Sequence, residues 1–278
     1  MDQKVCLITG ASKGLGFALA KEFADQGYRV FGTTRSSEKV DDSLALSKNI
    51  TFIEVDLLAA ESITAGVAQV LSEVGHVDTL INNAGYGLFG AVEEASDEEV
   101  KDNFAVNLYG LLNVTKAILP SMRQRKSGHI MNIASIGGYV GSFPGVGVYC
   151  STKFAVAGVT EGLKADLEGT GIDVTVVYPG YFRTNFLSKE SMKVAKQKIG
   201  DYAAAHEVVQ AHRIGINKNQ PGDPKKFAKV MCQATEMKPR PFHLFLGSDS
   251  LEYAKDKIQL VQSELDKYRS LSLSTDFE

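Results

Sequence analysis

The amino-acid sequence predicts an α/β protein with a doubly wound, seven-stranded parallel sheet. Seven short apolar runs alternate with longer segments of helical periodicity, and a glycine-rich turn follows the first run directly. Runs that are apolar throughout are typical of strands buried on both faces, and helices between them place successive strands parallel. Because such connections are short and right-handed, we expect the strand order 3-2-1-4-5-6-7 in a single domain over residues 1–278.

Composition narrows the class of protein. The 278 residues carry 30 Lys plus Arg against 33 Asp plus Glu, a net charge of −3, which gives no electrostatic reason to expect nucleic acid as a partner. The three cysteines, Cys6, Cys150 and Cys232, lack metal-type spacing, so we expect reduced thiols. The first residues show no basic-then-apolar signal pattern, and no apolar run approaches about eighteen residues. We therefore expect a cytoplasmic protein without a membrane span.

The first strand is predicted at Lys4–Thr9, followed by a turn rich in glycine and a helix that Gly27 ends. A helix start offers free N–H groups and the positive end of the helix dipole, and glycines let a pyrophosphate approach the main chain. A tight structural turn is the alternative. Three glycines within seven residues after a first strand favour dinucleotide binding; they are Gly10, Gly14 and Gly16.

The second strand, Tyr28–Thr34, ends at Arg35. In a dinucleotide-binding fold the residue after this strand faces the adenosine ribose, where an acid binds the 2′-hydroxyl and an arginine accommodates a 2′-phosphate. Arg35 takes this position, and Lys13 lies inside the glycine turn. Two cations at one ribose favour NADP over NAD. The alternative is that both are solvated surface charges.

The third strand, Ile50–Val55, runs into Asp56, which either accepts a hydrogen bond from the adenine amino group or caps a turn. A helix is predicted at Ala60–Val74. The fourth strand, Val77–Ile81, runs into Asn82–Gly85. These polar segments follow strand ends, so we expect them at the same edge of the sheet as the glycine turn.

Gly85–Gly90 matches G-x-G-x-x-G literally, but we do not interpret it as a second phosphate site. A dinucleotide fingerprint opens its helix at the glycines. Here the next helix start is signalled only later, by the capping box formed by Ser96 and Glu99. We expect Gly85–Gly90 to be a loop that lines the cofactor.

A long helical pattern covers Ser96–Arg125, as one helix or as two with a bend, and Asn107 lies inside it. The fifth strand, His129–Ala134, ends at Ser135. Ligands of open parallel sheets bind outside the carboxyl ends of the strands. Ser135 therefore stands where a catalytic group is expected.

Tyr149 and Lys153 are four residues apart, which places both side chains on one face of a helix predicted from about Tyr149 to Gly169. An adjacent ammonium favours the phenolate, so we expect Lys153 to lower the pKa of Tyr149. Free tyrosine titrates near 10, and a phenol that acts as acid and base near neutrality needs a pKa lower by about 2–3. The spacing also arises by chance, so this interpretation depends on the rest of the chain.

The remaining segments complete the sheet. The sixth strand is predicted at Ile172–Tyr178 and the seventh at Phe242–Leu246. Between them lies a lysine-rich insertion at about 185–220, the candidate substrate loop. A helix opens at Asp223-Pro224, with the aspartate as N-cap and the proline at the first position. A charged helix and polar tail at about 250–278 end the chain.

His206-Glu207 and His212 in the insertion resemble a zinc motif only superficially. The H-E-x-x-H motif requires histidines four residues apart on one helix face, and these are six apart. We therefore expect no metal.

Taken together, these motifs resemble the classical short-chain dehydrogenase/reductase family over about residues 1–250. The resemblance implies a Rossmann fold and an NADP-dependent enzyme. The sequences of Gly32–Arg35 and Asn83–Gly87 are similar to those of the family branch that contains 17-beta-hydroxysteroid and retinol dehydrogenases. This similarity implies a bulky apolar substrate. The matching segments are Thr9–Gly16 (TGASKGLG), Asp56, Asn82–Gly85 (NNAG), Asn107, Ser135, Tyr149-x-x-x-Lys153, and Pro179-Gly180 with Thr184.

The resemblance also implies a role for each residue. Tyr149 is expected to donate or accept the proton at the carbonyl oxygen, Ser135 to bind that oxygen, and Lys153 to hold the nicotinamide ribose. Asn107 is expected to kink its helix and anchor a water of the proton relay. The residues expected to contact the cofactor are Gly10, Ser12, Lys13, Gly14, Leu15, Gly16, Arg35, Asp56, Leu57, Asn83, Ala84, Gly85, Tyr149, Lys153, Pro179, Gly180, Phe182 and Thr184.

The implied activity is hydride transfer from NADPH to a ketone or aldehyde, or the reverse from an alcohol. The alternative is a sensor or scaffold that binds NADP without turnover, and the complete set of Asn107, Ser135, Tyr149 and Lys153 argues against it. Members of the family commonly pair the helices around Asn107 and after Tyr149. We therefore expect a homodimer or homotetramer.

Overall fold

The structure is a computed structural model that describes residues 3–40 and 47–277. One sheet contains seven strands in the order β3-β2-β1-β4-β6-β7-β9, and every neighbouring pair is parallel. Numbered along the chain, these strands are the first to the seventh, so the predicted order 3-2-1-4-5-6-7 is confirmed. The strands are β1 (Val5–Ile8), β2 (Arg29–Thr34), β3 (Ile50–Glu54), β4 (Thr79–Asn82), β6 (Gly128–Ile133), β7 (Ile172–Pro179) and β9 (His243–Leu246).

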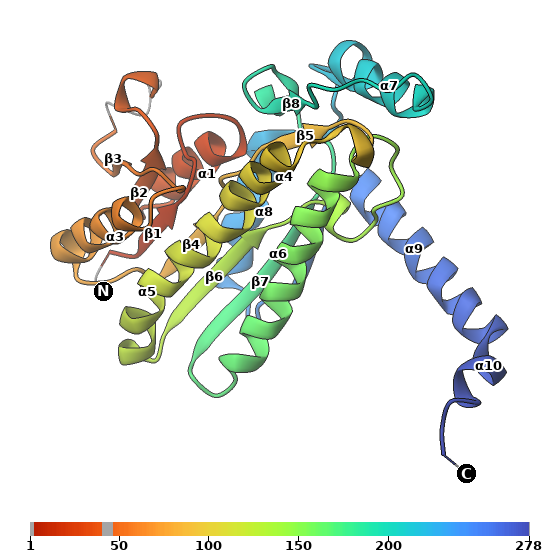
Figure 1. The fold of residues 1–278 in the computed structure, drawn as a ribbon. Coiled ribbons are helices and arrows are strands. Elements are labelled where there is room, and N and C mark those ends of the chain that lie inside the picture. The colour runs from red at the N-terminus through yellow and green to blue at the C-terminus, as the bar shows by residue number, and fades with distance from the viewer. Residues whose placement is uncertain (1–2, 41–46, 278) are drawn as a thin grey trace.

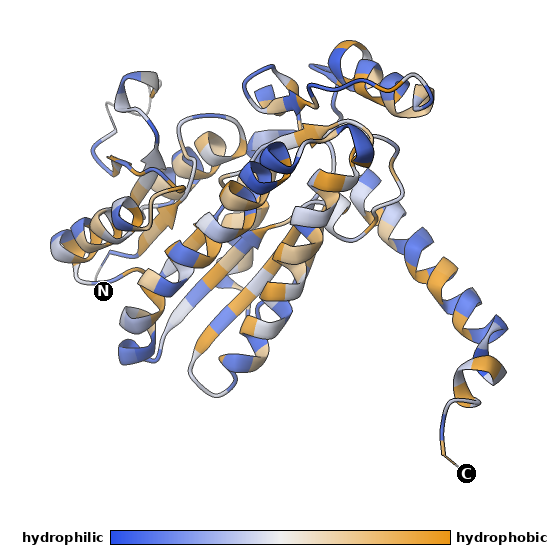
Figure 2. Cartoon of the chain, in the orientation of Figure 1, coloured by the Kyte–Doolittle hydropathy of each residue, from blue (hydrophilic) through white to orange (hydrophobic). Residues whose placement is uncertain are grey.

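Helices cover both faces of this sheet (Figure 1). One face carries α3 (Ala60–Val74), α5 (Leu111–Arg125) and α6 (Gly147–Asp166), and the other carries α1 (Gly14–Asp25) and α8 (Pro224–Glu236). Each face has its own apolar cluster between strands and helices. Figure 2 shows apolar residues concentrated on the strands and on the inner faces of the helices. Burial on both faces explains why the strands are mainly apolar, and the polar strand residues His129, Asn132 and Thr175 are themselves buried.

The segment around Asn107 is one continuous helix that contains a π-helical turn. Ser96 caps α4 (Asp97–Phe104), and its Oγ accepts the N–H of Glu99 at 3.3 Å. The π-helical turn, Ala105–Gly110, joins α4 to α5 without a break. Asn107 is buried in this turn. A π-turn inserts an extra residue into a helix, and Asn107 is the residue of this turn that contacts Tyr86 and Thr152.

A second, two-stranded parallel sheet lies above the carboxyl ends of the main strands (Figure 1). It pairs β5 (Gly87–Phe89) with β8 (Met192–Val194). The prediction that Gly85–Gly90 is a loop is therefore wrong at its centre. The pairing joins two segments about a hundred residues apart, so the local pattern carried no signal for it. The insertion also contains α7 (Ala203–Gln210) and a π-helical turn, Ala211–Ile216.

The C-terminal helices α9 (Ser248–Lys267) and α10 (Arg269–Leu273) extend away from the body of the protein (Figure 1). Only the start of α9 is anchored: Ser250 Oγ donates to the carbonyl oxygen of Tyr178 at 2.7 Å. Ala254 is the last buried residue of the helix. Within the described part of the chain, we find no helix with the length and apolar character to cross a membrane.

Candidate active site

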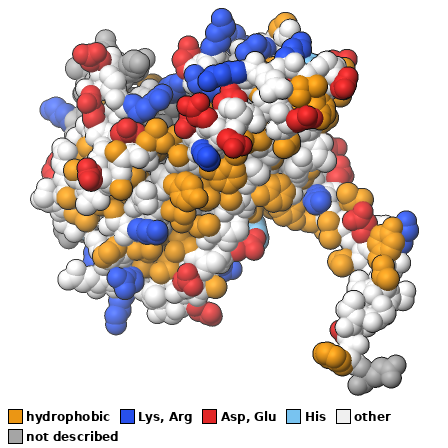
Figure 3. All heavy atoms as spheres, viewed as in Figure 1, with side chains coloured by type: hydrophobic (Ala, Val, Ile, Leu, Met, Phe, Trp, Pro, Cys, Tyr) orange, Lys and Arg blue, Asp and Glu red, His pale blue; other side chains and the backbone are white. Residues whose placement is uncertain are grey.

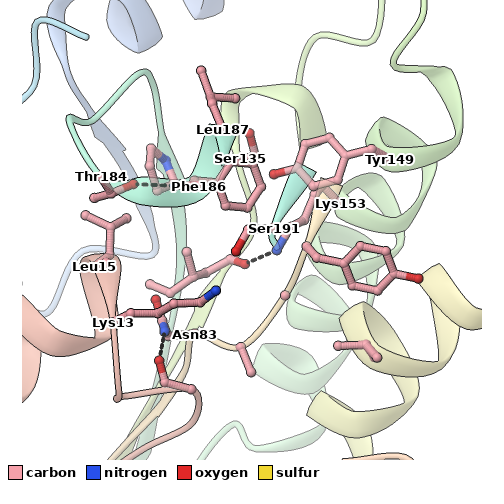
Figure 4. A pocket seen from close by; sticks show the side chains of 18 of the residues that line it. Lys13, Leu15, Asn83, Ser135, Tyr149, Lys153, Thr184, Phe186, Leu187 and Ser191 are labelled. Carbon is pink, nitrogen blue, oxygen red and sulfur yellow. Dashed lines mark hydrogen bonds between the residues drawn. The ribbon is translucent and has the colours of Figure 1, made fainter. Parts of the chain in front are cut away.

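A cavity of about 530 Å³ opens at the carboxyl ends of the strands. Of the residues predicted for the site, Gly16 and Asn107 do not line it. Figure 4 shows Lys13, Leu15 and Asn83 near the glycine turn, and Ser135, Tyr149 and Lys153 farther along the cavity. The predicted residues in its lining are Gly10, Ser12, Lys13, Gly14, Leu15, Arg35, Asp56, Leu57, Asn83, Ala84, Gly85, Ser135, Tyr149, Lys153, Pro179, Gly180, Phe182 and Thr184.

The glycine turn between β1 and α1 requires its glycines for two different reasons. Gly10 and Gly14 have φ values of +65° and +62°, in the left-handed region that side chains disfavour. Gly16 is needed for packing, because a Cβ there would lie 2.2 Å from the carbonyl oxygen of Gly10. Gly16 therefore holds the helix against the turn, and its contact with the cofactor stays a prediction.

The N-terminus of α1 has the features of an anion-binding site. No side chain caps this helix, whose N-cap residue is Lys13. An uncapped helix start leaves main-chain N–H groups available and adds the positive end of the dipole. Lys13 and Arg35 are both exposed at the rim of the cavity. The donor set at this end therefore fits a pyrophosphate and a further phosphate.

The carboxylate of Asp56 and the amide of Asn83, which both line the cavity, also form hydrogen bonds that stabilise the local structure. Asp56 Oδ1 accepts the N–H of Leu58 at 2.9 Å, which is the turn-capping alternative for this residue. Asp56 also lines the cavity. Asn83 Nδ2 donates to the carbonyl oxygens of Thr9 at 2.9 Å and Gly10 at 3.1 Å. Asn83 thus ties the end of β4 to the glycine turn.

Lys153 is buried at the far end of the cavity. Its Nζ donates to the carbonyl oxygen of Ile133 at 2.8 Å, and the residue is only 5% exposed. Burial lowers the pKa of Lys153 to about 8. One of the three ammonium hydrogens is used by Ile133, and the other two remain for further acceptors.

Tyr149 lies beside Ser135, one helical turn from Lys153 (Figure 4). Burial raises the pKa of the phenol well above its usual value, and the hydrogen bond with the Ser135 hydroxyl lowers it by less. The prediction that Lys153 lowers the pKa of Tyr149 is therefore wrong for this structure. The ammonium is directed to Ile133, and desolvation dominates the phenol. Tyr149 is accordingly protonated at neutral pH.

Asn107 does not line the cavity, but its side chain forms hydrogen bonds with two segments that do. Its Nδ2 donates to the carbonyl oxygen of Tyr86 at 2.9 Å and to Thr152 Oγ1 at 3.0 Å, and its Oδ1 accepts the N–H of Tyr86 at 3.0 Å. It thereby joins the segment after β4 to α6, which carries Tyr149 and Lys153.

The part of the cavity beyond Tyr149 is largely apolar. Two of its segments, Gly85–Gly90 and the insertion at about 185–220, were expected at the site from the sequence, but residues such as Phe89 and Phe186 were not singled out. Tyr149 faces Phe89 with ring centroids 6.4 Å apart and Phe186 at 6.0 Å. These residues come from β5, α6 and the insertion, so only the tertiary pairing of β5 with β8 brings them together. The residues not identified from the sequence include Phe89, Phe143, Val146, Cys150, Tyr181, Phe186, Leu187 and His212.

The two histidines of the insertion have different partners. His206 Nε2 lies 2.6 Å from Oε1 of the buried Glu94, and His212 Nε2 lies 2.8 Å from the hydroxyl of Tyr181. No group of three or more potential metal ligands occurs in residues 3–40 and 47–277. The contact of His206 with Glu94 fastens α7 to the segment after β5.

A sheet of this order, with a glycine turn and a Ser–Tyr–Lys group on one cavity, defines a dinucleotide-binding oxidoreductase fold. The chain belongs to the short chain dehydrogenase family, whose model matches residues 4–195. It is 36% identical over 249 residues to a 3-ketodihydrosphingosine reductase of Bacteroides thetaiotaomicron, covering 89% of each chain.

Solved structures agree with this assignment. A short-chain dehydrogenase from Streptomyces avermitilis is 36% identical and superposes with a TM-score of 0.91, covering 99% of this chain and 100% of that one. ElxO with NADP bound is 26% identical with a TM-score of 0.74, covering 90% and 100%.

Proposed function

We propose that this oxidoreductase transfers a hydride between NADPH and a ketone or aldehyde, or in reverse from an alcohol. One observation carries the proposal: a single cavity joins the glycine turn to Ser135, Tyr149 and Lys153. The name of the Bacteroides relative, a 3-ketodihydrosphingosine reductase, and the NADP bound to ElxO support the same reaction type and cofactor.

Tyr149 is the proposed acid. When bound, NADPH supplies the hydride. Tyr149 then gives its proton to the carbonyl oxygen, where negative charge develops. The conjugate acid of an alkoxide is about as weak an acid as water, so a phenol remains the stronger acid even after burial has raised its pKa.

Ser135 and Lys153 complete the proposed reaction site. The Ser135 hydroxyl lies beside Tyr149 and donates to the reacting oxygen, which stabilises the developing charge most in the transition state. The two ammonium hydrogens of Lys153 that Ile133 leaves free bind the nicotinamide ribose. Lys153 thus connects cofactor and proton donor.

Asn107 is the proposed anchor of a water that returns a proton to the site. Both of its amide hydrogens are already used, by Tyr86 and Thr152. A water there is therefore held by an oxygen, either the second lone pair of Oδ1 or the main-chain carbonyl that a π-helical turn frees from the regular ladder.

The charges and the lining support two finer proposals. Lys13 and Arg35 at the rim favour NADP over NAD, because a 2′-phosphate pairs with both cations. The aromatic and aliphatic lining beyond Tyr149 favours a bulky apolar carbonyl compound. We further propose that the protein is cytoplasmic.

We also propose a homodimer or homotetramer that pairs α5 and α6. Figure 3 shows apolar side chains gathered across the face that these helices cover. Phe154 and Tyr109 are 43% and 58% exposed, and Gly158 and Gly162 of α6 have open space beside them. Small residues next to an exposed aromatic ring allow a second helix to approach closely.

The direct test is to follow NADPH oxidation against a panel of ketones and aldehydes, with NADH in parallel. We expect turnover with NADPH and at least tenfold less with NADH. Equal rates with NADH would contradict the role of Lys13 and Arg35 and leave the chemistry intact. Tight NADPH binding without turnover on any substrate would favour the sensor or scaffold alternative.

A further inference from the structure

We infer that Tyr181 and His212 form a fixed hydrogen-bond acceptor for the substrate, which selects a carbonyl compound that also carries a hydroxyl or amino group. This inference rests on the proposed function and adds a chemical class of substrate to it. Both residues line the cavity.

The hydrogen bonds of His212 determine which atom carries the proton. His212 Nδ1 lies 2.7 Å from the main-chain carbonyl oxygen of Val208. A carbonyl oxygen only accepts, so Nδ1 carries the hydrogen. His212 is 8% exposed, and burial lowers its pKa, which keeps the imidazole neutral. In neutral imidazole the other nitrogen, Nε2, is an acceptor.

The direction of the next hydrogen bond follows. The Tyr181 hydroxyl lies 2.8 Å from His212 Nε2. Because Nε2 accepts, Tyr181 donates its only hydroxyl hydrogen to it. The phenolic oxygen of Tyr181 then has lone pairs but no hydrogen left to offer. Toward the substrate, Tyr181 therefore acts as an acceptor and binds an O–H or N–H group.

The main chain holds Tyr181 in place as well. Its N–H donates to Asp249 Oδ2 at 2.7 Å, and its carbonyl oxygen accepts the N–H of Gly222 at 3.0 Å. With His212 at the hydroxyl, Tyr181 is fixed at three points from three segments of the chain. An acceptor held in this way loses little freedom when a ligand binds.

The pair lies close to the reacting group. His212 packs edge-on against Phe89 at 5.2 Å, and Phe89 lies parallel to Tyr149 at 6.4 Å. One aromatic ring therefore connects His212 to the proposed acid. The polar group of the substrate would lie a few bonds from its carbonyl, within reach of both tyrosines.

Surrounding residues make this acceptor selective. Phe89, Val146 and Leu187 belong to one buried apolar cluster, and Phe89 packs directly against His212. An acceptor that faces an apolar ligand in such surroundings loses its hydrogen bond to water. A site built to bind a donor rejects the analogue that lacks it. We expect wild-type protein to prefer a hydroxyketone over the plain ketone of equal chain length by about 10- to 100-fold in kcat/KM.

The test compares a 1-hydroxy-2-alkanone with the 2-alkanone of the same length, using NADPH. The readout is the ratio of the two kcat/KM values within each variant, so that a general loss of activity cancels. We expect Y181F to bring the ratio close to 1, mainly through KM of the hydroxyketone. H212L should also lower the ratio. H212Q should restore much of it, because an amide oxygen can accept the Tyr181 hydrogen.

Each outcome separates the inference from the proposed function. A wild-type ratio near 1, or an unchanged ratio in Y181F, would overturn the inference and leave the proposed function standing. Absence of turnover with every carbonyl compound would overturn both. Circular dichroism and NADPH-binding measurements on each variant identify those that fail to fold.

Discussion

Oδ2 of Asp249 accepts the main-chain N–H of Tyr181 at 2.7 Å. This bond joins the first turn of α9 to the loop after β7, which carries Gly180, Phe182 and Thr184, three of the residues expected to contact the cofactor. Gly180 packs against the same carboxylate, where a Cβ would lie 2.2 Å from Oδ1. The C-terminal helix thus positions one wall of the active site, although most of its length lies outside the body (Figure 1).

The first prediction concerns this contact. D249A leaves the N–H of Tyr181 without its buried partner, which costs about 1–3 kcal/mol. We expect a lower Tm and a fall in kcat of about tenfold, because the loop loses its fixed position. D249N retains an acceptor oxygen and should stay close to wild type. Unchanged Tm and kcat in D249A would show that the loop is held by other contacts.

The second prediction concerns the choice of cofactor. K13A and R35A should each raise KM for NADPH by about 10- to 100-fold, because each removes a charge-assisted contact to the 2′-phosphate. KM for NADH should change little. The matched control is K255A, which removes an exposed lysine on the distant C-terminal helix. Equal effects of R35A on both cofactors would contradict a 2′-phosphate contact.

The third prediction concerns the pH dependence of the insertion. Burial raises the pKa of Glu94, but hydrogen bonds from Ile199 N–H, His206 and Ala91 N–H outweigh it and lower the pKa to about 2. The ordinary value for glutamate is about 4.3. A carboxyl whose pKa falls on folding stabilises the folded state above its unfolded pKa. This contribution is lost as the pH falls from about 4.3 toward 2.

We therefore expect the Tm of wild-type protein to decrease in acid more steeply than that of E94Q. At pH 7 the variant should melt about 2–4 °C below wild type. E98Q, at an exposed position four residues along the chain, serves as the control and should match wild type. Parallel pH profiles for E94Q and wild type would rule out this carboxylate as the cause.

The fourth prediction concerns assembly. We expect F154R to convert the oligomer to monomers in light scattering, because it places a charge in the apolar face of α6. V230R makes the same change at an exposed apolar residue of α8, on the opposite face of the sheet, and should leave the mass unchanged. A wild-type monomer at micromolar concentration would refute the proposed pairing.

The sequence was sufficient to predict the sheet and the meeting of Ser135, Tyr149 and Lys153 on one cavity. The seven strands are short, mainly apolar runs because most of their residues are buried between two layers of helices, and parallel connections restrict their order. Ser135 follows a strand end, and Tyr149 and Lys153 share a helix face, so local spacing predicted that they would meet. The capping box at Ser96 and Glu99 also formed as predicted.

Features that depend on distant pairing were not predictable in this way. Phe89 and His212 reach the cavity only because β5 pairs with β8 and the insertion folds over them. The pKa of Tyr149 was wrongly predicted for a related reason. Helical spacing shows that Lys153 is near, but the depth of burial, which determines the direction of the shift, comes from the tertiary fold.

The most direct test of the central claim is the rate of NADPH oxidation by Y149F, with any ketone that the wild-type protein reduces. Replacing the acid should lower kcat by about 10²- to 10⁴-fold while NADPH still binds. Y139F, the same substitution at a tyrosine outside the cavity lining, is the matched control and should keep its activity. Wild-type turnover in Y149F would contradict the assignment of Tyr149 as the proton donor.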